Sequence, residues 1–489
     1  MIRDERGSMT EFLSMLFLVF LLLISVCMEG IYLYVGRGKA MGACMAGLSH
    51  TRGNYQKELE KRYHIYALDP RYQKKMAGDF QEKIKESLEE SKDSFTFQVG
   101  ASQASKFINL TEQRGEVLKY QIGQLMKYEA GTDIMKFWKS KLTDVQKMGE
   151  NVSEVQDQMK KSEIQAEQQK KEEKDALKHK EEASAAKTKG KDPRKGLMSM
   201  LREGSVSLVM GDQKVSDQKI RIVYGKRDTT KTKLWNFMSR KETDRQMQEV
   251  KQVSSGTRLT TELPSILYSL KYFHNLTDEK DKEGLRYEVE YLIAGKDTEK
   301  ECLGIVFWKM IGLRFLTNLS YVYQNPTKEK EAALLAASIL GVTGIPPLIS
   351  LAKNLLLAAL AYGESIMDVR NLAEGKKVPF QKNASTWQME FSGLATLTGR
   401  QKTVQQGMDY EDYLFLLLIM QRDKTQRYFR MLDVMEQNIR MQVSDLRLTQ
   451  CAVSYQMTIN IGIRKLGFGG LTLPLGNHTN WKFQRTASY

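Results

Sequence analysis

The stretch MTEFLSMLFLVFLLLISVCMEGIYLYV, residues Met9–Val35, decides how this chain is organised, because few soluble helices are apolar over such a length. It contains no Lys or Arg, and its acidic residues are Glu11 and Glu29. At roughly 1.5 Å rise per residue, a helix from its start to Glu29 is about 30 Å long, which matches the hydrocarbon thickness of a bilayer. Tyr32 and Tyr34 follow, and such aromatic residues are enriched at membrane surfaces.

Two other structures fit part of this pattern. A secretory signal peptide has an apolar region of only about 7–15 residues and a small-residue cleavage site. This run is longer and ends in a Glu and two tyrosines. A buried core helix would rarely be apolar on every side at the extreme N-terminus. We therefore expect residues 1–36 to form a leader and a single transmembrane anchor. The flanking basic residues do not orient it, because they are nearly balanced: Arg3 and Arg6 before it, and Arg37, Lys39 and Arg52 after it.

The rest of the chain has the composition of a globular protein, with 41% hydrophobic and 9% aromatic residues and only 8 Pro among 489 residues. This length allows two or three domains of ~150 residues each. The net charge of +15 favours an anionic partner such as a lipid headgroup, a cell-wall polymer or nucleic acid. A solvated basic surface is the preferred interpretation, because the Lys and Arg residues are spread along the chain among acids.

The four cysteines exclude a zinc ribbon and a disulfide-dense scaffold, because no C-x-x-C pair occurs. Cys27 lies in the apolar stretch, whereas Cys44, Cys302 and Cys451 are far apart in the sequence. One disulfide outside the membrane stays open as an alternative, but buried thiols are the preferred interpretation.

The pattern along the chain predicts an α-rich α+β fold, in which a large extracytoplasmic domain with long helices and a few short strands follows the anchor. Residues 37–139 are expected to form a membrane-proximal region, with a helix from Lys39 to about Tyr66 and strand-like patches over Phe95–Leu110, broken by Gly100. Residues 140–196 are rich in Lys, Glu and Gln, which is typical of a solvated helical arm or flexible linker. Residues 197–489 are expected to form the main α-rich domain.

Within this main domain, alternation predicts strands at Ser205–Met210, Lys219–Tyr224 and Leu285–Ile293. Cys302–Tyr323 is predicted to be helical. A further long helix is expected from Tyr410 through Ile439. After Thr449 the pattern changes to short strands around a turn that contains three glycines, Gly467, Gly469 and Gly470.

Ala332–Ala352 is uncharged and formally long enough for a second membrane span. However, Pro346 and Pro347 interrupt it, and a proline pair starts a new helix rather than sitting inside one. We therefore expect a buried helical hairpin whose second arm runs from Pro347 to about Ala373 and closes at Gly375.

Few residues indicate chemistry. No phosphate-binding loop, H-E-x-x-H helix or G-x-S-x-G elbow occurs. The five His never pair at ligand spacing, and no basic stripe with interleaved aromatics indicates nucleic-acid binding. We therefore expect a non-enzymatic protein with no catalytic, cofactor-binding or metal-binding residues, no identified small-molecule substrate, and nucleic acid disfavoured as a partner.

Several motifs carry a resemblance. The N-terminus RDERGSMTEF (Arg3–Phe12), running into an apolar helix, resembles the leader of TadE-like pseudopilins of tight-adherence (Tad/Flp) pilus systems. The whole chain is similar to an uncharacterised Firmicute family of membrane-anchored proteins, a domain of unknown function associated with Tad pilus loci. The segments that carry this similarity are NYQKELEKRYHIYALD (Asn54–Asp69), LRYEVEYLIAGK (Leu285–Lys296), AYGESIMDVRNLAEGKKVPF (Ala361–Phe380) and MDYEDYLFLLLIM (Met408–Met420).

The resemblance implies a cytoplasmic N-terminus, an extracytoplasmic bulk and a role in pilus or secretion-apparatus assembly beside other pilin-like proteins. It also implies leader processing after Gly7, which would leave Ser8 as the first residue. Glu11 lies four residues past that cut, one short of the typical spacing, so we expect the leader to be retained. Glu11 is a candidate helix-packing acid, because an unpaired charge near hydrocarbon is costly. The alternative from another class is a cell-envelope sensor or wall-binding protein with a basic surface.

Overall fold

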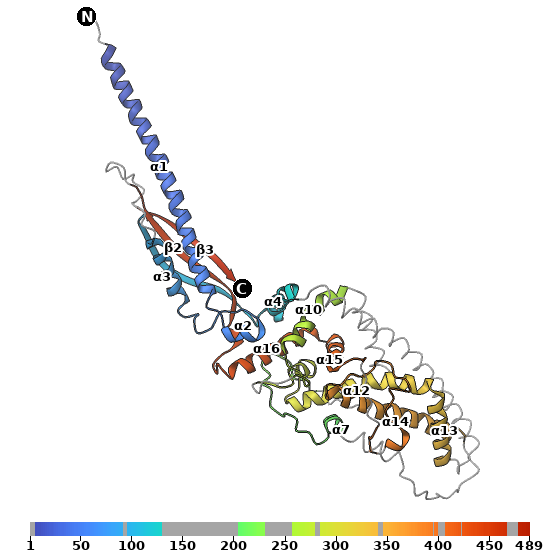
Figure 1. Ribbon diagram of the computed structural model, residues 1–489. Coiled ribbons are helices and arrows are strands. Elements are labelled where there is room, and N and C mark those ends of the chain that lie inside the picture. The colour runs from blue at the N-terminus through green and yellow to red at the C-terminus, as the bar shows by residue number, and fades with distance from the viewer. Residues whose placement is uncertain are drawn as a thin grey trace, which may run out of the picture. The chain divides into compact units, whose positions relative to one another are not determined.

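The computed structural model describes residues 5–90, 95–129, 204–229, 257–278, 284–340, 346–394, 396–399, 406–421, 423–466 and 478–489 (Figure 1). They form two compact units. Unit 1 combines Met1–Leu118 with Val443–Tyr489, and unit 2 is Lys119–Gln442. The charged arm expected over residues 140–196 and the glycine-containing turn expected near Gly467 lie outside the described residues. The described part is helix-rich with one small sheet, which confirms the α-rich α+β class.

Unit 1 is built on a single long helix, α1 (Glu5–Arg52, 48 residues). The expected anchor and the helix expected after it are therefore one uninterrupted element. The second helix was expected to reach Tyr66, but α1 ends at Arg52 and a separate helix, α2 (Lys57–Tyr63), follows. The interruption has a clear cause, since Tyr55 bridges to Leu68 and folds the chain back on itself.

The sheet of unit 1 joins segments from opposite ends of the chain. Its strands are β1 (Phe97–Asn109), β2 (Ala452–Arg464) and β3 (His478–Ser488), antiparallel in the order β1-β2-β3. Strands were expected in these regions, but they are long rather than short, at 13, 13 and 11 residues. Gly100 does not break β1. It lies at a register shift, where an added Cβ would come within 3.0 Å of the Asn460 carbonyl oxygen.

The core of unit 1 lies between one face of this sheet and two helices, α1 and α3 (Met76–Glu89). The second half of α1 contributes mainly small side chains, which permit close helix approach. At Gly47 a Cβ would stand 3.1 Å from the side chains of both Phe80 and Ile84. The sheet contributes alternate residues of β2 and β3, as a half-buried strand should. The buried members are Ala40, Ala43, Cys44 and Leu48 of α1, Phe80, Ile84 and Leu88 of α3, and Tyr455, Met457, Ile459, Ile461 and Phe483 of the sheet.

The described part of unit 2 consists of helices joined by irregular segments and contains no β-strand beyond isolated bridges. Its longest helices pack side by side, with α12 against α11, α13 and α14. The helices are α4 (Glu116–Glu129, which begins at the unit boundary), α7 (Ser205–Met210), α10 (Thr257–Tyr272), α11 (Glu288–Ala294), α12 (Glu299–Gln324), α13 (Pro326–Leu340), α14 (Pro346–Ala373), α15 (Tyr410–Ile419) and α16 (Lys424–Arg440). The described residues also contain short 3-10 turns at η1 (Gln113–Gly115) and η5 (Leu448–Gln450) in unit 1 and at η4 (Phe391–Gly393) in unit 2.

Three strand predictions in unit 2 are wrong. Ser205–Met210 is helix α7, and Lys219–Tyr224 is irregular apart from one bridge from Lys219 to Thr298. Leu285–Ile293 contains most of helix α11, in which every residue is buried. The alternation of charged and apolar residues there misled the prediction, because Glu288 and Glu290 are buried hydrogen-bond acceptors rather than solvent-facing residues.

The helical hairpin is confirmed, but its first arm is not buried, because only Ala332 and Ala336 are buried among the described side chains of α13 and Leu334 is 74% exposed. Helices α13 and α14 pack together on either side of residues 341–345, which lie outside the described part, and Gly375 closes α14 with φ of +76°. The helix predicted at Cys302–Tyr323 is also confirmed, as α12. The long helix expected from Tyr410 is instead two helices, α15 and α16. The chain restarts at Asp423, whose carboxylate caps α16 by accepting from the Gln426 amide.

All four cysteines are free thiols, which agrees with the preferred interpretation. Cys27 is exposed on α1, whereas Cys44, Cys302 and Cys451 are buried. Burial raises the pKa of the Cys44 thiol to about 11 and that of Cys302 to about 12. Both therefore behave as small apolar core residues.

The close contact at Gly47 gives a test of the unit 1 core. Gly47→Leu should destabilise unit 1 by about 1–3 kcal/mol, because the new side chain has to displace Phe80 and Ile84. The matched control is Gly42→Leu, at an exposed site on the same helix with nothing within 4 Å of the added Cβ, and it should leave stability unchanged or slightly higher. Urea unfolding followed by hydrogen exchange of β2 amides measures both. Equal effects of the two substitutions would contradict this packing.

Candidate functional site: an exposed apolar helix and a buried charge network

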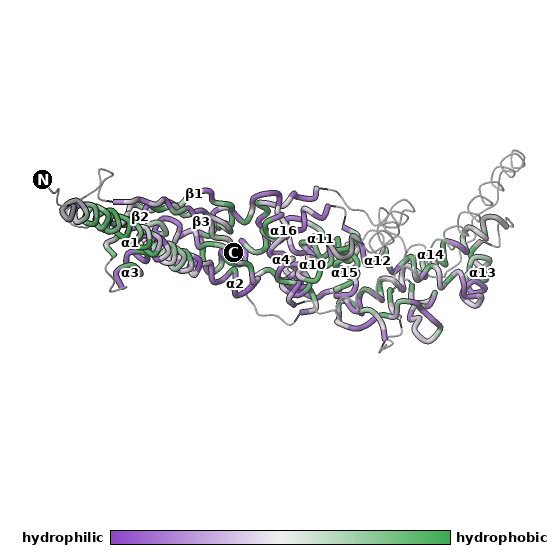
Figure 2. Tube along the Cα trace, turned by 90° about the horizontal axis from the view of Figure 1, so that it is seen from above, coloured by the Kyte–Doolittle hydropathy of each residue, from purple (hydrophilic) through white to green (hydrophobic). Residues whose placement is uncertain are grey.

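The first half of α1 projects a continuous apolar surface. Figure 2 shows α1 coloured largely as hydrophobic. Nearly all of its large hydrophobic side chains from Met9 to Val35 are exposed, for example Phe12 at 67% and Phe20 at 57%. Soluble proteins rarely leave so long an apolar surface uncovered. α1 is long and apolar enough to cross a membrane. Helix α12 passes the same test, but 78% of its most apolar window is buried, so it is a core helix of unit 2.

The exposed half of α1 passes into its packed half at Gly36. A Cβ added there would lie 2.5 Å from Cδ1 of Ile463, so the helix meets the sheet with almost no gap. One turn earlier, the Tyr32 ring stacks on Phe95 with centroids 4.7 Å apart, and the Lys39 ammonium lies 4.9 Å from the same Phe95 ring. Aromatic and basic side chains thus gather where the apolar surface ends.

The site residues predicted from the sequence all lie on this helix. Gly7 and Ser8 are part of the first turns of α1, and Glu11 is exposed one turn further along. No break in the helix separates them from the apolar surface. Their predicted roles in processing and lateral packing stay predictions.

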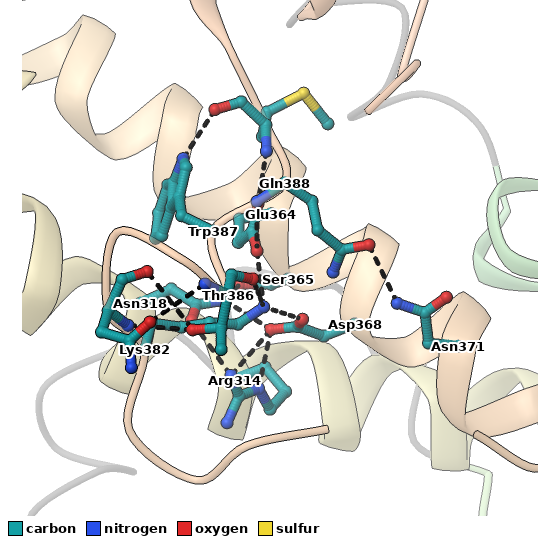
Figure 3. Close-up of polar contacts among 12 residues, drawn as sticks. Arg314, Asn318, Glu364, Ser365, Asp368, Asn371, Lys382, Thr386, Trp387 and Gln388 are labelled. Carbon is teal, nitrogen blue, oxygen red and sulfur yellow. Dashed lines mark hydrogen bonds and ion pairs between the residues drawn. The ribbon is translucent and has the colours of Figure 1, made fainter. Parts of the chain in front are cut away.

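Sequence reasoning missed a network of buried charged side chains in unit 2 (Figure 3). Asp368 of α14 receives both Nε and Nη2 of Arg314, from α12, at 2.9 and 2.8 Å. The Lys382 ammonium, on the loop after α14, lies 2.6 Å from Asp368 and 2.6 Å from Glu364. These four side chains are at most 1% exposed. Two cations and two carboxylates make the cluster neutral.

Every member of this network is also bound to the surrounding protein. Arg314 donates to the Phe380 carbonyl and the Tyr413 hydroxyl, both at 3.1 Å. Asn318 donates to Asp368 at 2.9 Å. Glu364 accepts from the backbone amides of residues 388 and 389 at 2.7–3.1 Å. Buried ions are tolerated only when their hydrogen-bonding capacity is filled in this way.

The protonation behaviour of the two carboxyls differs. Burial alone would raise the pKa of Asp368, but the adjacent Arg314 guanidinium and Lys382 ammonium hold that pKa below its ordinary value. Burial and the neighbouring Asp368 raise the pKa of Glu364, against the opposing effect of Lys382. The hydrogen bonds and ion pairs of the cluster tie the loop at residues 380–389 to α12 and α14. Because its four charged side chains are buried, the cluster offers no access to a substrate.

The contact that Glu364 makes with backbone amides recurs through unit 2. Buried carboxylates accept hydrogen bonds from backbone amides of irregular segments, which here have no sheet to pair with. Asp433 of α16 is the fullest case, because it receives the amides of Val223, Tyr224 and Gly225 and the Tyr291 hydroxyl, all at 2.7–2.9 Å. The others are Glu288 with the His274 amide, Glu290 with Leu276, Glu299 with Arg286 and Tyr287, and Glu364 with Gln388 and Met389.

Unit 2 also has an open pocket of about 840 Å³ lined by α7, α12 and the loops between them. Its charged residues are largely engaged with each other. Arg227 pairs with Asp297 at 2.6 Å, and the Lys296 ammonium donates to the Asp228 carbonyl at 2.5 Å. Among the described residues, no group of three or more His, Cys, Asp or Glu is arranged to hold a metal ion.

The network could have been found in part from the sequence. Glu364 and Asp368 are four residues apart and are the only charged residues between Leu355 and Val369, and Arg314 interrupts another apolar run. A charge on an apolar helix face is costly unless it is paired, so such residues indicate a buried partner. The identity of that partner, Lys382, depends on how the loop after α14 folds back.

Removing the Lys382 charge tests the network. Lys382→Met should destabilise unit 2 by about 3–5 kcal/mol, because Glu364 and Asp368 are left buried with Arg314 as their only cation. The matched control is Lys376→Met, whose ammonium pairs with Glu374 at an exposed position and contributes little. Thermal unfolding of the two variants measures the difference. A Lys382→Met protein as stable as the control would show that the network is not an energetic unit.

Comparison with known proteins places the chain in a family without an assigned activity. No curated protein and no solved structure matches it. The model of a family of unknown function, DUF5702, matches residues 181–463, more than half of the chain. The matched span includes the Arg314–Asp368 network and nearly all of β2, and it leaves out α1. The chain therefore belongs to DUF5702, a family of unknown function.

Proposed function

We propose that this protein is a non-catalytic, membrane-anchored component of a cell-envelope assembly, of the pseudopilin-like kind found in Tad-type pilus or secretion systems. Its N-terminus is cytoplasmic and its bulk is extracytoplasmic. One observation carries the proposal: α1 is a single helix whose first half exposes an apolar surface and whose second half packs under an antiparallel sheet.

This continuity favours a permanent anchor over a removable signal sequence. A signal sequence is cut at small residues just after its apolar region. Here that region is followed by Gly36, Ala40 and Ala43, which are buried in unit 1 as part of the same helix. Cleavage at this point would require the helix to unwind where it meets the core. Retention keeps the core helix and the apolar segment together.

The pseudopilin-like role rests on Glu11. Its carboxylate is exposed within an otherwise apolar helical surface, where an isolated charge in hydrocarbon would cost several kcal/mol. Lateral packing against another such helix offers a polar partner and removes this cost. The N-terminal motif Arg3–Phe12, which resembles pseudopilin leaders, supports the same role.

A wall-binding or sensor protein is the second candidate. The net charge of +15 favours it, because an excess of positive charge attracts anionic polymers of the envelope. Both candidates share the membrane anchor and differ in the partner of the extracytoplasmic bulk.

The anchor is tested by inserting charge into the exposed half of α1. Leu21→Arg combined with Leu22→Arg should release the protein from membranes in alkaline carbonate, because each Arg costs about 2.5–3.5 kcal/mol at a helix centre. The control, Met45→Arg with Ala46→Arg, places the same charges at exposed positions on the packed half of α1 and should stay membrane-bound.

The intact mass of the wild-type protein separates the remaining outcomes. It should include residues 1–7, and protease added to wall-stripped cells should digest the chain beyond about Arg37. A mature chain starting at Ser8, with cleavage lost in Gly7→Ala, would make it a processed pseudopilin. A chain starting beyond Val35 in the soluble fraction would make α1 a signal sequence and overturn the anchor.

Assembly is tested by co-purification from membranes. Pilin-like subunits should co-purify with the wild-type protein and be lost or reduced in Glu11→Gln, which removes the charge that a neighbouring helix would neutralise. Glu82→Gln, at an exposed position on α3, is the matched control and should change nothing. If no pilin-like subunit co-purifies with the wild type, the pseudopilin-like role is wrong and the wall-binding candidate takes its place.

A further inference from the structure

The sheet of unit 1 has one covered face and one open face. The covered face packs on α1 and α3. Residues on the open face follow from the strand register, because side chains alternate between faces and paired residues share a face. Two rows made only of amide and hydroxyl side chains cross it, Gln103–Thr458–Gln484 and Ser105–Gln456–Thr486.

The open face is made almost entirely of amide and hydroxyl side chains. They are exposed or half-buried, and two of them, Gln484 and Gln456, are joined by a hydrogen bond of 2.5 Å. A third partial row contains Gln98, Gly462 and Asn480, and there the Asn480 amide lies over the space that a side chain at Gly462 would fill. The amide, hydroxyl and lysine members are Gln98, Gln103, Ser105, Ser454, Gln456, Thr458, Asn460, Asn480, Lys482, Gln484, Thr486 and Ser488. The register also places Ile108, Arg464 and His478 on this face.

The charged side chains of the three strands are all basic. Asp and Glu make up 59 of the 489 residues, yet none occurs in β1, β2 or β3. The strands carry Lys106, Arg464, Lys482 and Arg485, and Lys482 stands within the open face, paired with Asn460. A sheet face that serves only solubility usually mixes charges of both signs. This distribution of charge favours a negative ligand.

The composition also narrows the class of ligand. Protein interfaces bury aromatic and aliphatic anchors, and sheets that bind single-stranded nucleic acid stack bases on exposed aromatic rings. The aromatic residues paired along this sheet, Phe97, Trp481 and Phe483, lie on the covered face instead. Amides donate and accept hydrogen bonds equally well, as hydroxyl groups of a ligand require, and a lysine ammonium binds phosphate.

We propose that the open face of the β1–β2–β3 sheet binds an anionic, hydroxyl-rich polymer of the cell envelope, of the polyol-phosphate kind. The amide and hydroxyl rows bind the hydroxyls of the extended polymer, and Lys482 binds a phosphate. An encounter with this polymer in the cell rests on the proposed extracytoplasmic location of the bulk of the chain. The affinity of the sheet for the polymer does not depend on that location, and it is compatible with either candidate function.

Binding is measured on the full chain in nanodiscs of neutral lipid, with poly(glycerol phosphate) as the probe. Lys482→Gln should lower the affinity roughly fivefold, since one lysine near an anionic surface contributes about 1 kcal/mol. Lys83→Gln removes one charge from α3, outside the open face, and should have little effect. Gln456→Leu combined with Gln484→Leu should weaken binding of poly(glycerol phosphate) more than binding of inorganic polyphosphate, which has no hydroxyl-bearing units.

Two outcomes would overturn the proposal. One is absence of binding, or binding that Lys482→Gln and the double Leu variant leave unchanged. The other is single-stranded DNA that binds more tightly and responds to the same variants, which would make the face a nucleic-acid surface. Neither outcome touches the membrane anchor, which carbonate extraction tests separately. Circular dichroism of each variant confirms that the exposed substitutions leave the sheet folded.

Discussion

The close packing of α1 against α3 and the sheet is the contact on which unit 1 depends. Small residues on one side of α1 allow the helix to approach, and at Gly47 the neighbouring Phe80 and Ile84 leave no room for a side chain. The same helix extends without a break into the exposed apolar segment. This contact therefore fixes the direction of the segment proposed to sit in the membrane relative to the core of unit 1. A flexible linker at Gly36 would uncouple them. Gly36 is not a flexible linker, because it lies within the continuous helix and Ile463 packs directly beside it.

Unit 2 depends on a different kind of contact, in which buried carboxylates accept hydrogen bonds from backbone amides. Its described residues include long irregular segments and no named strand, so many backbone amides need another acceptor. Carboxylates on α11, α12, α14 and α16 fill this need, and Asp433 alone binds three consecutive amides. Burial raises the pKa of Asp433 despite these donors, which shows how much desolvation such an arrangement costs. These carboxylates are therefore structural groups rather than parts of a charged surface.

The sequence predicts elements that follow from local patterns, and it does not predict contacts in which buried charges find partners far away in the chain. Patterns that reflect one local rule succeed, such as the apolar run of α1 and the proline pair at Pro346 and Pro347. The change to strands after Thr449 is also predicted, although not their length. Leu285–Ile293 fails because Glu288 and Glu290 look solvent-facing but are buried acceptors for amides of residues 274 and 276. The candidate residues Gly7, Ser8 and Glu11 could be placed on a helix by hydropathy alone. The Arg314–Asp368–Lys382–Glu364 network could not, because its members come from three separate segments that only the tertiary fold brings together.

The order of the chain adds a constraint on how the two units form. Unit 2 is inserted between β1 and β2 of unit 1, so the sheet combines strands that are more than 300 residues apart. During synthesis, α1 and β1 emerge first, and β1 has no partner until β2 has been made. Such long-range pairing carries a loop-closure cost that a folded insertion reduces, because it brings its own ends together. Unit 2 therefore has to reach a compact state without help from the sheet, and its buried carboxylates accept hydrogen bonds from backbone amides of the same continuous segment.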